Sequence, residues 1–303
     1  MMTSTARRTD VGAVLRAPLA ALQWRLLLLW LVFLLLPTAV AALPAWRALA
    51  DLLDHSVHAA EWARRFDGLM FGDMMTALGD ASAWFHGSLV LATALALLLG
   101  PFVTGMTVAV GRAGRTLGFG QLLQSGVIEY GRMFRMLLWS LLPYAIAIGL
   151  GAMAFGVAHK QADQAVLQST ADRYQHTALW VLLVLFLLAH AVVESARAAF
   201  IVDPGLRSAT RALGRGFMQL VRRPLGTLLS YLVIGAIGYA IALALGVSRL
   251  QTPAVGVGGF LLALLFAELA VLAVGWTRIA RLFALAAVGR SLAPRRGGLP
   301  PAL

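Results

Sequence analysis

The chain has 303 residues, of which 60% are hydrophobic and 13% are charged, whereas soluble domains average about 45–50% apolar and about 25% charged residues. This composition excludes an ordinary soluble domain and predicts an all-α, polytopic transmembrane helical bundle. The formal net charge of +12 raises the alternative of nucleic-acid binding. We expect no nucleic-acid partner, because the basic residues flank the apolar runs. The chain has no cysteine, which excludes disulfides, thiol catalysis and cysteine-ligated metal centres.

Six apolar runs have the length that a membrane-spanning helix needs, about 20 residues. They occupy residues 26–43, 87–111, 136–158, 177–201, 226–247 and 255–276. The connections are too short for a separate soluble domain, so we predict a single integral membrane domain over residues 1–303. The first run ends near Pro37 and Ala39-Val40-Ala41, which resemble a signal-peptide cleavage site. We expect the run to be retained as an anchor; cleavage would leave five spans.

Basic residues are concentrated on one side of the six predicted spans. The segments on that side contain Arg7, Arg8, Arg16, Arg25, Arg112, Arg115, Arg132, Arg135, Arg207, Arg211, Arg215, Arg222, Arg223, Arg278, Arg281, Arg290, Arg295 and Arg296. The opposite connections contain Arg47, Arg64, Arg65, Lys160, Arg173 and Arg249. Because cytoplasmic connections are enriched in Lys and Arg, we predict that both termini are cytoplasmic, the N-in/C-in topology.

Two of the predicted cytoplasmic connections mix arginine with apolar residues, which is typical of amphipathic helices that lie in the headgroup layer. The apolar residues are Leu117, Phe119, Leu122, Leu123, Val127 and Ile128 in one connection and Leu206, Leu213, Phe217 and Leu220 in the other. Such interfacial helices would bind anionic headgroups through arginine. Ordinary connectors that obey the positive-inside rule are an equally good interpretation.

A weak internal repeat relates the second and third spans to the fourth and fifth. The segment Arg135–Tyr144 aligns with Arg222–Tyr231 at an offset of 87 residues, and the same offset places the second span over the fourth. The repeat predicts that two helical hairpins of the bundle share one arrangement.

The predicted outer loop, residues 44–85, is the only acidic connection, and its first half has helical periodicity. Asp51, Asp54, His55 and His58 share one face of that helix, and imidazole with carboxylate is a ligand set for divalent metals. A solvated polar face explains the same pattern, and we favour that interpretation. We therefore predict no metal and no cofactor.

The predicted spans contain few ionisable residues. His190, Glu194 and Arg197 lie on the fourth span at positions i, i+4 and i+7, and Glu268 lies at a comparable depth on the sixth. Ionisable groups inside a membrane are costly and face the interior of the bundle, where they find partners. This polar cluster is the candidate site. A proton or ion relay would use such residues, but we favour a structural ion pair.

The chain resembles a broad group of uncharacterised six-helix bacterial inner-membrane proteins over about residues 90–240. The resemblance rests on Gly100-Pro101-Phe102-Val103-Thr104-Gly105, Arg112, Arg115, Phe119-Gly120-Gln121-Leu122-Leu123, Val202-Asp203-Pro204-Gly205 and Arg222-Arg223-Pro224-Leu225. It implies a six-helix fold and a bacterial inner-membrane location, and it implies no activity and no site residues.

No phosphate-binding loop, His-Glu-x-x-His motif or Gly-x-Ser-x-Gly motif occurs in the sequence, so we predict no enzymatic activity. The first functional hypothesis is a non-catalytic membrane component whose partners are anionic lipids, a protein or further copies of the chain. The alternative is a small-solute or ion transporter or channel that uses the intramembrane cluster. A metalloenzyme built around His55 and His58 ranks last.

Overall fold

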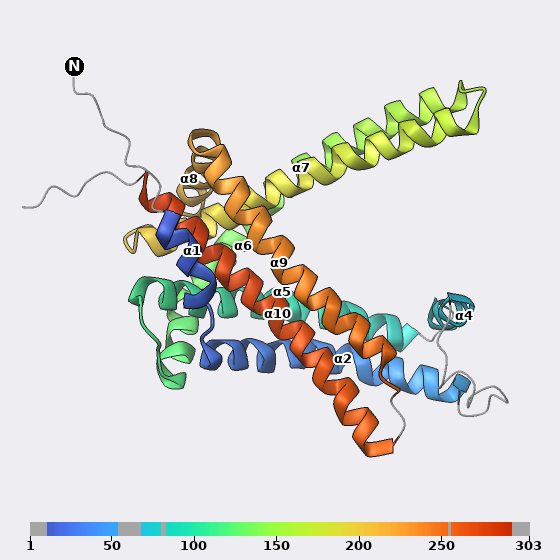
Figure 1. Ribbon diagram of the computed structural model, residues 1–303, viewed down its shortest axis with the longest axis horizontal. Coiled ribbons are helices and arrows are strands. Elements are labelled where there is room, and N and C mark those ends of the chain that lie inside the picture. The colour runs from blue at the N-terminus through green and yellow to red at the C-terminus, as the bar shows by residue number, and fades with distance from the viewer. Residues whose placement is uncertain (1–10, 54–67, 80–82, 254–255, 293–303) are drawn as a thin grey trace, which may run out of the picture.

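The computed structural model of the protein describes residues 11–53, 68–79, 83–253 and 256–292 (Figure 1). Within these ranges the secondary structure is helical and contains no strand, which confirms the predicted all-α class. The helices are α1 (Val11–Ala20), α2 (Trp24–Leu53), α4 (Gly68–Gly79), α5 (Ala83–Ala113), α6 (Phe119–Asp163), α7 (Gln168–Val202), α8 (Ala209–Arg222), α9 (Pro224–Gln251) and α10 (Gly256–Arg290).

Six helices, α2, α5, α6, α7, α9 and α10, are long and apolar enough to cross a membrane. They coincide with the six predicted apolar runs and extend beyond most of them. Large apolar side chains on these helices face outward; Leu141 is 61% exposed and Trp180 is 66% exposed. Soluble monomers rarely expose so much apolar surface. The six apolar helices and their exposed side chains therefore indicate a multi-pass membrane protein.

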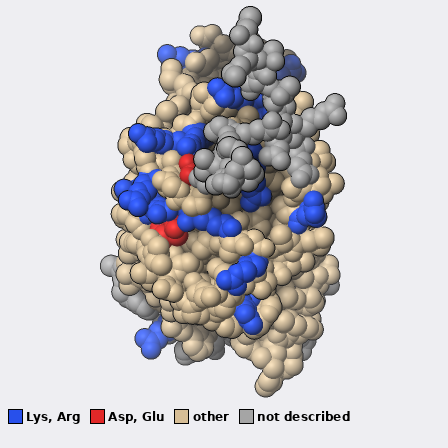
Figure 2. Space-filling model, turned by 90° about the vertical axis from the view of Figure 1, so that its left-hand side faces the viewer, with Lys and Arg blue, Asp and Glu red and all other residues tan. Residues whose placement is uncertain are grey.

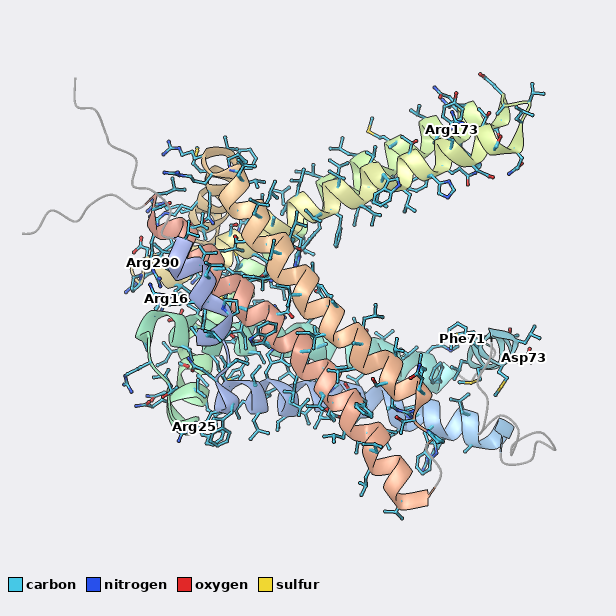
Figure 3. All side chains as sticks on the ribbon, in the orientation of Figure 1. Arg16, Arg25, Phe71, Asp73, Arg173 and Arg290 are labelled. Carbon is cyan, nitrogen blue, oxygen red and sulfur yellow. The ribbon has the colours of Figure 1, made fainter. Side chains whose placement is uncertain are left out.

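The long helices run back and forth between two ends of the molecule (Figure 1). One end contains α1, the start of α6, α8, the end of α10 and residues 114–118 and 203–208, and we call it the arginine end. Arg16, Arg25 and Arg290 lie there, whereas Asp73 and Arg173 lie at the opposite end (Figure 3). Figure 2 shows the arginine end face-on, with many basic and few acidic side chains.

The helices repeat one arrangement three times along the chain. Each unit has a short helix at the arginine end, a long helix that leaves this end and a long helix that returns: α1, α2 and α5; then α6 and α7; then α8, α9 and α10. In the second unit the short and long helices are continuous as α6. In the third they separate at Arg223-Pro224, because proline lacks an amide donor and disfavours helical geometry in the residue before it.

The short helices pack in a cyclic order. Each contacts the returning helix of the preceding unit: α1 on α10, the start of α6 on α5, and α8 on α7. Small residues permit these contacts. A Cβ atom at Gly105 would lie 3.0 Å from Glu129 Cβ, and one at Gly216 would lie 2.5 Å from the carbonyl oxygen of Val192. These two contact pairs are related by the predicted offset of 87 residues.

The returning helices α5, α7 and α10 meet in the centre of the arginine end. A Cβ atom at Gly111 of α5 would touch the side chains of Ile201 on α7 and Phe283 on α10. Both hydrophobic core clusters contain residues of these helices, whereas the parts far from the arginine end expose their apolar side chains. His190, Glu194 and Arg197 therefore lie in the part of the bundle that is packed by protein.

Candidate functional site

Glu194 is the centre of a charged cluster between the returning helices. It lies in the alanine-rich segment Ala189–Ile201 of α7, whose small side chains let the neighbouring helices approach and leave the Glu194 side chain 1% exposed. Glu194 Oε1 accepts a hydrogen bond of 2.6 Å from Arg197 Nη1, one helical turn away. Glu194 Oε2 has no hydrogen-bond partner within the described residues. A buried carboxylate needs such an ion pair, because its isolated charge is poorly solvated there.

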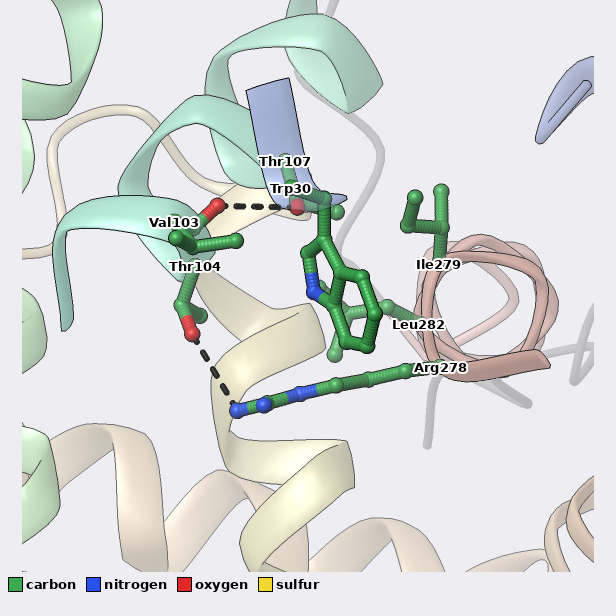
Figure 4. Close-up of a pocket in the computed structure, with 7 residues that line it drawn as sticks. All are labelled: Trp30, Val103, Thr104, Thr107, Arg278, Ile279 and Leu282. Carbon is green, nitrogen blue, oxygen red and sulfur yellow. Dashed lines mark hydrogen bonds between the residues drawn. The ribbon is translucent and has the colours of Figure 1, made fainter. Parts of the chain in front are cut away.

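Two further arginines lie on α10, beyond ion-pair distance of this carboxylate. Arg278 and Arg281 are one turn apart, and both interact electrostatically with Glu194. The Arg281 side chain lies over the ring of Tyr231, with 4.9 Å between the guanidinium carbon and the ring centroid. Arg278 Nη2 donates a hydrogen bond of 3.3 Å to Thr104 Oγ1 of α5 (Figure 4). Neither arginine forms an ion pair with a described carboxylate at bonding distance.

The cluster therefore has an excess of positive charge. Among the described residues, the charges of Arg197, Arg278 and Arg281 act on the single carboxylate of Glu194, and Arg197 alone is at ion-pair distance. Full compensation of such charges inside a membrane protein requires further anionic groups. The four ionised side chains therefore carry a net positive charge.

His190 extends the cluster away from the arginine end. Its Nδ1 atom shares a hydrogen bond of 2.6 Å with the hydroxyl of Tyr144 on α6. On its other side the imidazole ring meets the edge of Tyr231 on α9 at a centroid distance of 5.7 Å. The histidine is thereby held between two helices that occupy equivalent places in the second and third units.

The structure brings three of the four predicted cluster residues together. His190, Glu194 and Arg197 are neighbours, whereas Glu268 lies ten residues before Arg278 on α10, about 15 Å along the helix axis. Glu268 forms no hydrogen bond or ion pair within the part of the chain that the structure describes. The arginines of α10 occupy the place that the sequence analysis considered for Glu268.

Sequence reasoning assigned Arg278 and Arg281 to a cytoplasmic flank. The structure instead places Arg281 in the protein interior, 5% exposed, and Arg278 beside a pocket. One signal was available in the sequence. The segment Leu282–Val288 remains apolar after the two arginines, and an exposed flank has no reason to keep such a run.

An open pocket lies beside the cluster. Its volume is about 150 Å³, and helices α5, α6, α7 and α10 all contribute to its walls. The residues that line it include Arg197, Arg278, Thr104, Leu97 and Leu137. A second cavity of about 10 Å³ lies beside Trp30 and the stem of Arg278 (Figure 4), and it has room for about one water molecule.

A second ion-pair group joins three helices at the arginine end. Glu129 of α6 binds Arg112 of α5 at 2.6 Å and Arg132 of α6 at 3.3 Å. Arg112 Nε also donates a hydrogen bond of 2.8 Å to the carbonyl oxygen of Phe200 on α7. The two arginines share one carboxylate, and the bond to Phe200 ties them to a third helix, so the geometry of the group is that of a structural clamp.

The low-ranked candidate metal ligands are not tested. Asp54, His55 and His58 lie outside the described residues, and Asp51 lies in the last turn of α2 with a side chain that is not described. Across the described ranges, no group of three His, Asp or Glu side chains is placed to hold a metal ion.

The helices and the central cluster define an all-helical, multi-pass membrane protein with a positively charged centre. The chain matches no protein-family model, no curated protein and no solved structure. The resemblance over residues 90–240 therefore stays a prediction.

Proposed function

We propose that the chain is a non-catalytic component of the bacterial inner membrane that binds anionic lipid at its arginine end. In this proposal six helices span the bilayer and both termini are cytoplasmic. The observation that carries it is the unequal charge of the two ends. The described basic residues at the arginine end include Arg16, Arg25, Arg112, Arg115, Arg132, Arg135, Arg207, Arg211, Arg215, Arg222, Arg223 and Arg290. An arginine near an anionic leaflet contributes about 1 kcal/mol to its attraction.

Helix α8 supports the lipid proposal through its two faces. Ala212, Gly216 and Gln219 are buried, and this face packs on α7. The opposite face exposes apolar and basic side chains together; Phe217 and Val221 are each 57% exposed, and Arg211 and Arg222 are exposed beside them. A helix with this distribution fits the boundary between headgroups and acyl chains.

Energy transfer to labelled lipid tests the proposal. Trp24 is exposed at the arginine end, and in a variant whose other tryptophans are replaced by phenylalanine it serves as the single donor to dansyl-labelled lipid in nanodiscs. We expect greater transfer to phosphatidylglycerol than to phosphatidylcholine, and the difference should shrink as salt is raised. Replacing Arg211 and Arg222 by Gln should reduce the preference, while replacing Arg173 and Arg249 at the opposite end should not. Equal transfer to both lipids would refute the proposal.

A second candidate function, proton or small-ion transport, is favoured by one observation. Tyr144, His190 and Glu194 lie in sequence along the interior of the bundle, and the first two share a hydrogen bond of 2.6 Å. Groups of this kind relay protons in transporters. A pH-sensitive dye inside proteoliposomes tests this candidate. A flux that His190→Ala abolishes would establish it, whereas no flux above that of protein-free liposomes would dismiss it.

A further inference from the structure

We propose that the pocket beside the charged cluster binds one phosphate group of an anionic phospholipid, with Arg197 and Arg278 as its ligands. The inference rests on the proposed lipid-binding function and deepens it, because it replaces general attraction at a charged surface by a defined site. The two guanidinium groups come from α7 and α10 and both line the pocket.

The charges around the pocket favour an anion of this kind. Arg278 has one hydrogen bond, to Thr104, and forms no ion pair with the described residues, so most of its N–H donors are available to a ligand. Arg197 gives one N–H group to Glu194 and retains others. Guanidinium groups bind phosphate oxygens in a bidentate manner. A phosphodiester between them would also offset the excess positive charge of the cluster.

The size of the pocket limits what it accepts. A volume of about 150 Å³ is smaller than the 300–1,000 Å³ of sites that enclose a drug-sized ligand. It accommodates a phosphate with its immediate substituents, and the remainder of a larger ligand has to lie outside. The rest of the ligand must therefore suit the surface at the mouth.

That surface is apolar and exposed. Leu97 of α5 lines the pocket, and Leu138 and Leu141 of α6 expose large side chains on the helix that forms its other wall. Acyl chains suit such a surface, whereas a free phosphate gains nothing from it. Arg197 lies five residues before the end of α7, about 8 Å inside the arginine end. This depth fits the boundary between headgroups and acyl chains of one leaflet.

Two variants remove the site by different means. Arg278→Gln removes one guanidinium group, and because it lowers the excess positive charge, we expect the variant to fold. Gly100→Leu leaves every charge in place. Gly100 lines the pocket, and a Cβ atom there would meet no other atom within 4 Å, so a leucine side chain would fill the space without disturbing a neighbour.

Each variant has a matched control on α6. Arg135→Gln removes an exposed arginine that does not line the pocket. Gly149→Leu adds the same side chain at an exposed glycine that also has open space around it. The controls separate loss of this site from loss of charge or added bulk anywhere on the protein.

Native mass spectrometry of the detergent-solubilised protein tests the proposal. Phosphatidylglycerol, phosphatidylcholine and inorganic phosphate are titrated separately. We expect saturable binding of one phosphatidylglycerol per chain that persists at high salt, with affinity lowered about tenfold in Arg278→Gln, as for loss of a charged hydrogen bond, and in Gly100→Leu. Gly149→Leu should bind as the unmodified protein does. Arg135→Gln should keep the salt-resistant binding of one lipid, because it lowers only the general attraction at the arginine end, which salt screens.

Three outcomes would overturn the site as proposed. If Arg278→Gln and Arg135→Gln lower the affinity for phosphatidylglycerol equally, the lipid is held by general attraction to the charged surface. The proposed function would then stand without this pocket. Binding of inorganic phosphate with the same dependence on Arg278, and none of lipid, would make the ligand a free anion. Binding of phosphatidylglycerol that neither pocket variant alters would place the lipid elsewhere.

Discussion

Tyr144 and Tyr231 contact the same imidazole ring, that of His190, from two different helices. The hydroxyl of Tyr144 shares a hydrogen bond with His190 Nδ1, and the ring of Tyr231 meets the imidazole edge to face. The two tyrosines are 87 residues apart, at equivalent positions of the second and third helical units. The repeat thus places two tyrosines against one histidine. One contact is a hydrogen bond and the other is a contact between rings.

This difference predicts unequal effects of the same substitution. Tyr144→Phe removes a hydrogen bond and should lower the free energy of unfolding by about 1 kcal/mol. Tyr231→Phe should change it by less, because the ring that contacts His190 and Arg281 remains and no hydrogen bond of the Tyr231 hydroxyl occurs among the described residues. Thermal denaturation in detergent compares them. A larger loss in Tyr231→Phe would contradict the hydrogen bond seen at Tyr144.

The contact between α7 and α8 gives a second prediction. A Cβ atom at Gly216 would lie 2.5 Å from the carbonyl oxygen of Val192 and 2.6 Å from the amide nitrogen of Ala196. These are backbone atoms, so Gly216→Ala should separate the helices and destabilise the protein by about 1–3 kcal/mol.

Gly214 is the control for that substitution because it lies on the same helix with open space around it. Gly214→Ala should stabilise the protein slightly, since alanine favours the helix by about 0.5–1 kcal/mol over glycine. Chemical denaturation followed by circular dichroism measures both variants. If the two substitutions have the same effect, α8 does not pack as described.

The features of the fold that a lipid bilayer requires could be predicted from the sequence. A helix in a bilayer must be long, apolar and internally hydrogen-bonded, so the six runs were visible in the sequence. The cyclic contacts of the short helices were not, because they depend on small residues such as Gly105 and Gly216, which also occur in helices for other reasons. The repeat at 87 residues indicated part of this arrangement.

The candidate site was predictable only within one helix. His190, Glu194 and Arg197 share a helix, and their spacing alone brings them together. Arg278 and Arg281 of α10 could not be assigned to the site in the same way, because the sequence does not show how far α10 continues into the protein core. Positive charge after an apolar run is typical of the end of a span. The sequence analysis therefore placed Arg281 in an exposed flank, although it is buried.

Glu194 and Glu268 should differ strongly when each is replaced by glutamine. Glu194→Gln removes the carboxylate that pairs with Arg197, and breaking a buried pair in this way costs about 3–5 kcal/mol. Glu268→Gln should change the free energy of unfolding by about 0.5 kcal/mol or less, because Glu268 has no ion pair within the described part of the chain.

Unfolding of both variants in mixed micelles by a graded denaturant compares these carboxylates directly. Restoration of stability by Glu194→Asp, which retains the charge, would separate the role of the charge from that of side-chain volume. A loss at Glu268 equal to that at Glu194 would contradict the placement of Glu268 away from any ionic partner among the described residues.

The proposed topology is testable by single-cysteine labelling, because the chain has no cysteine of its own. Lys160 is exposed near the end of α6 remote from the arginine end, and Arg211 is exposed on α8. If the arginine end is cytoplasmic, a membrane-impermeant maleimide added to cells with a permeabilised outer membrane should label Lys160→Cys and not Arg211→Cys. Both variants should react once the inner membrane is opened, because both positions are exposed. The reverse pattern would place the arginine end outside and would remove the cytoplasmic leaflet as the source of its lipid.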